Sequence, residues 1–205
     1  MDIIIFDYDG VIVDSLSLVF SIYNDLAPKY NCKKLKNKQE FTEFFKGNFF
    51  DGWGNNGISH KNSEKFLQEM ADNLAENMNK VSVFPGVSEA LERLSQDYRL
   101  VIISSNLSRV VDKALQSKNI TVIEEVVGAD KERSKVKKIE KVKERNPESK
   151  IYYVGDTTGD IYEGKKAGIT TIGVSWGFHG REIMNSAHPD YLVDTPAELL
   201  DVFKQ

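Results

Sequence analysis

Two aspartates separated by one residue follow an apolar run near the beginning of the sequence. The sequence reads MDIIIFDYDG, so Asp7 and Asp9 come directly after Ile3 to Phe6. A short, continuous apolar run is typical of a strand buried on both faces, which places the aspartates at a strand end. If the backbone stays extended through Tyr8, both carboxylates point to one side, about 7 Å apart. Their mutual repulsion indicates a bound cation or a shared proton.

Polar side chains also follow two later apolar runs. They are Ser104, Ser105 and Asn106 after the run 100–103, and Asp156 and Asp160 after the run 151–154. Ligands of open parallel sheets bind beyond the carboxyl ends of the strands, so these groups are expected to meet. Carboxylates suit Mg²⁺, which usually binds beside a phosphate. Hydroxyl and backbone N–H groups at the start of a helix suit that phosphate.

Four motifs in order resemble those of the haloacid dehalogenase superfamily, in its phosphoglycolate-phosphatase-like branch. The first is DYDGV at 7–11, the second is Ser104 after its apolar run, the third is a lysine near a helix start, and the fourth is GDTTGD at 155–160. A single DxDG is a weak signal, whereas four motifs in the right order are a strong one. The resemblance covers essentially the whole chain, including a helical insert that is a mobile cap in that family.

The resemblance implies a role for each acidic residue. Asp7 would be the nucleophile that forms an aspartyl phosphate, and Asp9 the general acid and base. Asp7, the carbonyl of Asp9 and Asp156 would hold Mg²⁺. Asp160 would orient the metal waters or the motif lysine.

Two positions leave alternatives open. Ser104 is preferred as the motif hydroxyl that binds phosphate, because it directly continues the apolar run; Ser105 is the competing register. Ser105 and Asn106 would then supply further phosphate contacts. Lys135 is preferred as the catalytic, phosphate-binding lysine, because a cation in a first helical turn costs about 0.3–1 kcal/mol and so suggests a use. Lys131, in the preceding loop, is the alternative.

The elements that position these groups follow a strand and helix alternation after residue 84. Strands are predicted at 100–103, 151–154, 171–174 and 191–193, and helices at 86–95, around 110–115, from Ser134, and at 160–167, where Gly168 ends the last one. This pattern predicts an α/β fold with a doubly wound, mostly parallel, Rossmann-like sheet. Residues 1–14 and 84–205 would form the catalytic core.

Residues 15–83 interrupt the alternation and predict a small helical cap domain. Helices are expected at 16–26, 40–45 and 63–78. A glycine-rich, aromatic stretch between the last two contains Lys46 and Trp53, which we expect to contact the leaving group of the substrate.

Composition limits the partners. The chain has 205 residues, is 40% hydrophobic and 28% charged, and carries a net charge of −4, which predicts no general attraction to nucleic acid or to a membrane surface. The single cysteine, Cys32, allows no internal disulfide. We expect a cytoplasmic protein without a membrane span or signal peptide, whose partner is a small phosphorylated metabolite. The oligomeric state and the identity of the ester stay open.

The sequence therefore predicts a Mg²⁺-dependent phosphatase, similar to phosphoglycolate phosphatase. A sugar phosphomutase or a phosphonate hydrolase of the same fold, the latter with Lys46 as a Schiff-base lysine, is an alternative. A phosphate-ligand binding module without turnover is the alternative from another class. A true dehalogenase is disfavoured, because displacing halide from carbon needs no bound metal and the acidic residues predict one.

Overall fold

The central element is a parallel sheet whose strands are ordered β3-β2-β1-β4-β5-β6. The computed structural model of the chain describes residues 1–46 and 60–204. Among these residues the strands are β1 (Ile3–Phe6), β2 (Arg99–Ile103), β3 (Glu125–Val127), β4 (Ile151–Gly155), β5 (Thr170–Val174) and β6 (Tyr191–Val193). The predicted fold class is confirmed.

Strand β1 lies between β2 and β4, and all four of its residues are buried. Phe6 is level with Ile102 of β2 and with Val154 of β4. The chain adds β2 and β3 on one side of β1 and then crosses to β4 on the other side. The carboxyl ends of β1 and β4 therefore form the switch point at which α/β sheets bind ligands.

Helices cover both faces of the sheet because successive strand residues point to opposite sides. Ile3 and Ile5 pack with Ile139 and Val142 of α7 (Lys135–Arg145), on the face that α8 (Thr158–Lys166) also covers. Side chains of the opposite face, such as Ile4, pack with α5 (Val87–Leu94), α6 (Ser108–Ser117) and α10 (Pro196–Val202). Helix α9 (Gly180–Ser186) packs beside β5 and α8.

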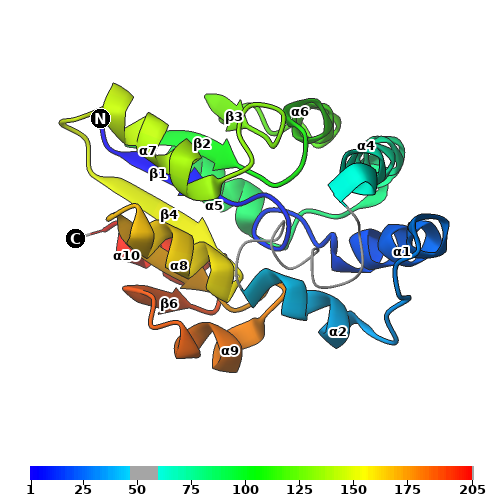
Figure 1. The fold of residues 1–205 in the computed structure, drawn as a ribbon. Helices are drawn as coiled ribbons and strands as arrows, with labels where there is room; N and C mark the ends of the chain where they lie inside the picture. The colour runs from blue at the N-terminus through cyan, green and yellow to red at the C-terminus, as the bar shows by residue number, and fades with distance from the viewer. Residues whose placement is uncertain (47–59, 205) are drawn as a thin grey trace.

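The insert lies at the end of the sheet toward which the arrowheads of β2 and β4 point (Figure 1). Its described elements are α1 (Leu16–Leu26), η1 (Ala27–Tyr30), α2 (Lys38–Thr42), η2 (Glu43–Lys46), α4 (His60–Asn77) and η3 (Met78–Lys80). Tyr23, Phe41 and Phe66 are fully buried at its centre, with the ring of Tyr23 5.7 Å from Phe41 and 5.9 Å from Phe66. These aromatic contacts join α1, α2 and α4.

Two antiparallel segments connect the insert to the sheet. The backbone N–H of Asp14 donates to the Ser82 carbonyl, and that of Phe84 donates to the Ile12 carbonyl, both at 3.0 Å. The buried residues of the insert and of the sheet join in one apolar cluster. The division into a core and a cap at 15–83 stays a prediction.

Some of the observed elements, including β3, α9 and α10, were not predicted from the sequence. Strand β3 has three residues, of which the first is Glu125 and only two are apolar, so it contains no recognisable apolar run. The start of α10 could have been recognised in the sequence, because a threonine followed by proline is typical of a helix N-cap and first residue. In the structure Thr195 is the N-cap, Pro196 is the first residue, and the Thr195 side chain accepts a hydrogen bond from the Glu198 backbone N–H. Helix α9 begins after His179, whose side chain does not cap it. No helix in the described residues is long and apolar enough to cross a membrane.

Replacing Phe66 by alanine should destabilise the protein. The ring fills the space between α4, Tyr23 and Tyr30, so its loss should lower the free energy of unfolding by about 3–5 kcal/mol. Equilibrium urea unfolding measures this loss. Tyr162→Ala is the matched control, because Tyr162 is 50% exposed and its removal should change stability by about 0.5 kcal/mol at most. Equal losses in the two variants would contradict this description of the insert's core.

Candidate active site

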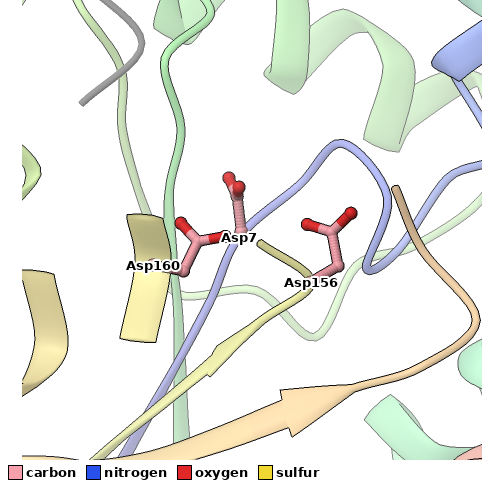
Figure 2. Close-up of side chains that lie close together, drawn as sticks. All are labelled: Asp7, Asp156 and Asp160. Carbon is pink, nitrogen blue, oxygen red and sulfur yellow. The ribbon is translucent and has the colours of Figure 1, made fainter. Parts of the chain in front are cut away.

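Three buried carboxylates meet at the carboxyl end of the sheet. Asp7 follows β1, Asp156 follows β4, and Asp160 lies in the first turn of α8. Each offers an oxygen within 4.8 Å of the others. Figure 2 shows Asp7 between Asp160 and Asp156, with the three side chains projecting from the strand ends and the helix start. The sequence prediction that these residues meet in space is confirmed.

Asp7 is fixed by the strands beside it and by a lysine. Its backbone N–H donates to the Val154 carbonyl at 2.9 Å, which continues the pairing of β1 with β4. Its Oδ1 accepts from the Tyr8 backbone N–H at 2.8 Å, and its Oδ2 accepts from Lys135 Nζ at 2.8 Å. The carboxylate therefore has a defined direction at the floor of the site.

Lys135 bridges two of the carboxylates. It is the first residue of α7, after the N-cap Ser134, and its Nζ also donates to Asp160 Oδ1 at 2.6 Å. Burial alone would lower the pKa of Lys135, but Asp160 and Asp7 raise it well above its ordinary value, so the ammonium stays charged. Lys131 instead donates to the Val126 carbonyl. Of the two predicted lysines, the structure brings Lys135 to the carboxylates.

Asp160 has donors on both of its oxygens. Its Oδ1 also accepts from the Tyr153 hydroxyl at 2.8 Å, and its Oδ2 accepts from the backbone N–H and hydroxyl of Thr157 at 3.1 and 2.6 Å, in a capping box at the start of α8. Burial opposes ionisation, but Lys135 and these donors hold the pKa of Asp160 below its ordinary value. Asp160 is thus an anion that orients Lys135.

Asp156 has an oxygen without a donor. Its Oδ2 accepts from the Phe178 backbone N–H at 2.7 Å, whereas its buried Oδ1 has no hydrogen-bond partner among the described residues. Glycine is needed beside it. A Cβ at Gly10, where φ is +80°, would lie 1.8 Å from Asp156 Oδ2, and a Cβ at Gly177 would lie 2.3 Å from the Asp156 Cβ. The backbone therefore closes tightly around this carboxylate.

The donor set fits a hard divalent cation such as Mg²⁺. Burial, followed by repulsion from Asp160 and Asp7, raises the pKa of Asp156 well above its ordinary value. Burial also raises the pKa of Asp7 to about 7, although Lys135 opposes the shift. A cation beside the unpaired Asp156 oxygen would relieve both penalties, and carboxylate oxygens are the ligands that Mg²⁺ prefers. The predicted carbonyl ligand of Asp9 stays a prediction.

Asp9 lies outside this cluster and is held by two neutral donors. The Ser15 hydroxyl donates to its Oδ1 at 2.6 Å, and Asn106 Nδ2 donates to its Oδ2 at 2.5 Å. Burial raises the pKa of Asp9 above its ordinary value, against the effect of these hydrogen bonds. A carboxyl group with a raised pKa that is held in one direction suits proton transfer.

The structure distinguishes the two serines. Ser104 is fully buried, and its hydroxyl accepts from the Asn106 backbone N–H at 3.0 Å. Ser105 and Asn106 line a cavity over the carboxylates, but Ser104 does not. Ser105 therefore lies at the cavity and Ser104 lies beneath the loop, and which of the two hydroxyls binds phosphate stays a prediction.

The cavity has a volume of about 520 Å³ and lies between the strand ends and the insert. Asp7, Asp9, Lys135 and Asp156 form part of its floor. The wall from the insert is mainly apolar and includes Val19, Phe45, Leu67, Met70, Ala71 and Leu74. Charged groups at the side include Glu64 and Arg133, which lie 3.6 Å apart. The site thus joins a charged floor to an apolar roof.

Of the two predicted insert residues, the structure describes Lys46, whose side chain does not line the cavity. Lys46 is exposed, and its Nζ lies 2.7 Å from Glu43 rather than over the carboxylates. Only its carbonyl reaches the core, where it accepts from the Thr158 hydroxyl at 3.3 Å. The expectation that the Lys46 side chain contacts substrate has no support in this arrangement. Trp53 lies outside the described residues.

Comparison with known proteins identifies the family of this chain. A family model described as haloacid dehalogenase-like hydrolase matches residues 4–174. The chain belongs to this family. A phosphoglycolate phosphatase of Synechococcus elongatus is 30% identical to this hydrolase over 100% of the chain and 98% of that protein. The pyrophosphatase PpaX of Oceanobacillus iheyensis is 25% identical over 97% of the chain and 95% of that protein.

Solved structures share the fold of this haloacid dehalogenase-like hydrolase. A haloacid dehalogenase-like family protein from Streptococcus pneumoniae superimposes with a TM-score of 0.81 at 22% identity, over 100% of this chain and 99% of that one. A predicted phosphatase from Clostridium acetobutylicum gives a TM-score of 0.83 at 20% identity, with the same coverage. Both superpositions agree with the overall fold described above.

Two residues near the site were missed. Phe178 lines the cavity and reaches Asp156 through its backbone N–H, a contact that no side-chain type reveals. Lys138 is 0% exposed, and its Nζ donates to the Ser104 carbonyl at 2.7 Å. Burial and the nearby Lys135 lower the pKa of Lys138 to about 7. Its position was detectable, because 135, 138, 139 and 142 follow the spacing of one buried helix face.

We expect Mg²⁺ to stabilise the hydrolase more strongly at high pH. The folded-state pKa of Asp7, about 7, lies above its ordinary value of 3.8, so between these values the folded protein holds a proton that the unfolded chain lacks. The stability of the metal-free protein should therefore fall as pH rises toward 7. Because protons compete with the cation, Mg²⁺ should raise Tm more at about pH 8 than at about pH 5.5.

Thermal unfolding with EDTA and with excess Mg²⁺ measures this difference. Asp156→Asn is the informative variant, because it removes the unpaired anionic oxygen and should lose most of the Mg²⁺ effect. An equal Mg²⁺ effect at both pH values, or an undiminished effect in Asp156→Asn, would contradict the assignment of these ligands.

Proposed function

We propose that this enzyme is a Mg²⁺-dependent phosphatase that hydrolyses a small phosphomonoester through an aspartyl-phosphate intermediate. The observation that carries the proposal is the pairing of a lysine-held carboxylate, Asp7, with a neighbouring carboxylate, Asp156, that has an oxygen free of donors. The first can attack phosphorus, and the second can bind the cation that this attack requires. The names of the relatives, a phosphoglycolate phosphatase and a pyrophosphatase, support phosphate chemistry.

In the first step Asp7 attacks phosphorus and the leaving alcohol departs. Lys135 holds the Asp7 carboxylate in one direction, and its ammonium offsets part of the negative charge as a phosphoryl group approaches. Asp160 keeps that ammonium in place from the other side. Nucleophilic catalysis of this kind divides one difficult hydrolysis into two easier steps.

Asp9 transfers the protons. In the first step it protonates the leaving oxygen, and in the second it accepts a proton from the water that hydrolyses the aspartyl phosphate. A raised pKa favours the protonated form that the first step needs. Ser15 and Asn106 fix the direction of the carboxyl group toward the cavity.

Asp7, Asp156 and the carbonyl of Asp9 would hold Mg²⁺. When bound, it supplies positive charge that neutralises the phosphoryl oxygens, so that an anionic nucleophile can approach an anionic ester. Phosphate contacts come from Ser105 and Asn106, which line the cavity beside Lys135. The enclosing insert favours small phosphorylated metabolites over nucleic acids or phosphorylated proteins.

Replacing Asp7 by asparagine should abolish turnover without unfolding the protein. The amide keeps the shape of the side chain but loses the nucleophilic oxygen, so kcat should fall by at least about 10³-fold. Phosphate release from a panel of small phosphate esters measures the loss. Asp112→Asn, an exposed change of the same type on α6, should keep full activity. Substantial turnover by Asp7→Asn would remove the covalent mechanism.

Removal of divalent cations should also stop the reaction reversibly. EDTA should lower phosphate release to background, and excess Mg²⁺ should restore it, because the buried carboxylates otherwise repel the phosphate. Ca²⁺ should restore little, since its looser coordination does not hold the nucleophile in line. Full activity in metal-free buffer would refute the Mg²⁺ dependence, and phosphate binding without any turnover would favour a binding module.

A further inference from the structure

We propose that Lys138 is a positioning residue that holds the loop 104–106, so that Asn106 keeps Asp9 in place to protonate the leaving group. This inference rests on the proposed phosphatase function. It gives a role to a buried cation that the reaction scheme above does not use.

The setting of Lys138 is costly for a lysine. Its side chain is 0% exposed, and its Nζ donates a hydrogen bond to a neutral group, the carbonyl of Ser104 at 2.7 Å. In the described part of the chain, no carboxylate lies within ion-pair distance of its Nζ. Burying an ammonium group against a neutral partner is unfavourable, so stability alone gives no reason for a lysine here.

Hydrogen bonds connect Lys138 to the proposed general acid. The Ser104 carbonyl accepts from Lys138, and the Ser104 hydroxyl accepts from the Asn106 backbone N–H at 3.0 Å. The side chain of Asn106 then donates to Asp9 Oδ2 at 2.5 Å. Ser104 is therefore held from α7 by its carbonyl, and it fixes the residue that directs Asp9.

Helix α7 thereby serves both catalytic carboxylates. Lys135 and Lys138 lie three residues apart on its buried face, which is the spacing of neighbours on a helix surface. The first lysine contacts Asp7, and the second holds the loop that contacts Asp9. One rigid element thus sets the nucleophile and the proton donor relative to each other.

The test compares two esters that differ in their need for a proton. Phosphoglycolate releases an alkoxide that must be protonated, whereas para-nitrophenyl phosphate releases a stable phenolate. The measured quantity is kcat/KM, which covers the steps up to departure of the leaving group. Lys138→Met keeps the apolar stem but removes the donor. It should lower kcat/KM for phosphoglycolate about tenfold more than for para-nitrophenyl phosphate. This ratio is smaller than the full effect of general acid catalysis, because the variant displaces Asp9 but does not remove it.

Two further variants separate positioning from general damage. Lys137→Met, an exposed change on the same helix, should leave both rates unchanged. Asn106→Ala should reproduce the selective loss, because it breaks the last link to Asp9. If the two residues act in one chain, the double variant Lys138→Met/Asn106→Ala should lose less than the sum of the single effects.

Equal loss for both esters in Lys138→Met, or no loss, would overturn the inference, as would additive effects in the double variant. If circular dichroism shows that Lys138→Met does not fold, kcat/KM for the same two esters is measured for Lys138→Gln, and the ratio of its two losses tests the inference instead. If the wild-type enzyme releases phosphate from para-nitrophenyl phosphate but not from phosphoglycolate, glycerol phosphate takes its place. Failure of the wild-type enzyme on all three esters would overturn the proposed function itself, which is a different result.

Discussion

The contact between the Lys135 ammonium and the carboxylates of Asp7 and Asp160 is the interaction on which the site depends. Three buried acidic groups with oxygens within 4.8 Å of one another repel strongly, and this ammonium is the cation bonded to two of them in the described residues. Asp160 is fully satisfied by Thr157, Tyr153 and Lys135, so it stays ionised. Burial, together with the remaining repulsion, raises the pKa values of Asp7 and Asp156, and a divalent cation bound between them would offset both effects.

The surrounding backbone is shaped by this crowding. Gly10 and Gly177 approach Asp156 so closely that any Cβ would collide with its side chain. The capping box of α8 places Asp160 one turn beyond Asp156, and the N-cap Ser134 starts α7 where its first residue can reach Asp7. Each helix start thus has two functions: it satisfies its own backbone groups and it delivers a charged side chain.

Much of this arrangement was predictable from the sequence because it follows from strand ends and helix starts. Apolar runs located Asp7 and Asp156, and an N-cap argument selected Lys135 over Lys131. What the sequence left open depended on finer detail. Which of Ser104 and Ser105 faces the cavity depends on one residue of register at the end of β2, where successive side chains face opposite ways. Lys138 was not singled out from the sequence, although its spacing placed it on the buried face of the helix with Ile139 and Val142. Phe178 acts through a backbone N–H, which sequence patterns cannot report.

The insert contributes walls and carbonyl groups, whereas the charged floor of the cavity comes from the strands and helices of the sheet. His179 links the two parts. Its Nδ1 accepts from the Thr158 backbone N–H, so Nε2 carries the hydrogen and donates to the Thr42 carbonyl at 2.9 Å. Because a carbonyl is present at every residue, this link is insensitive to the side chain at position 42. The contact that holds α2 against the start of α8 therefore does not depend on the side chains of the insert, including the apolar residues of α1 and α4 that wall the cavity.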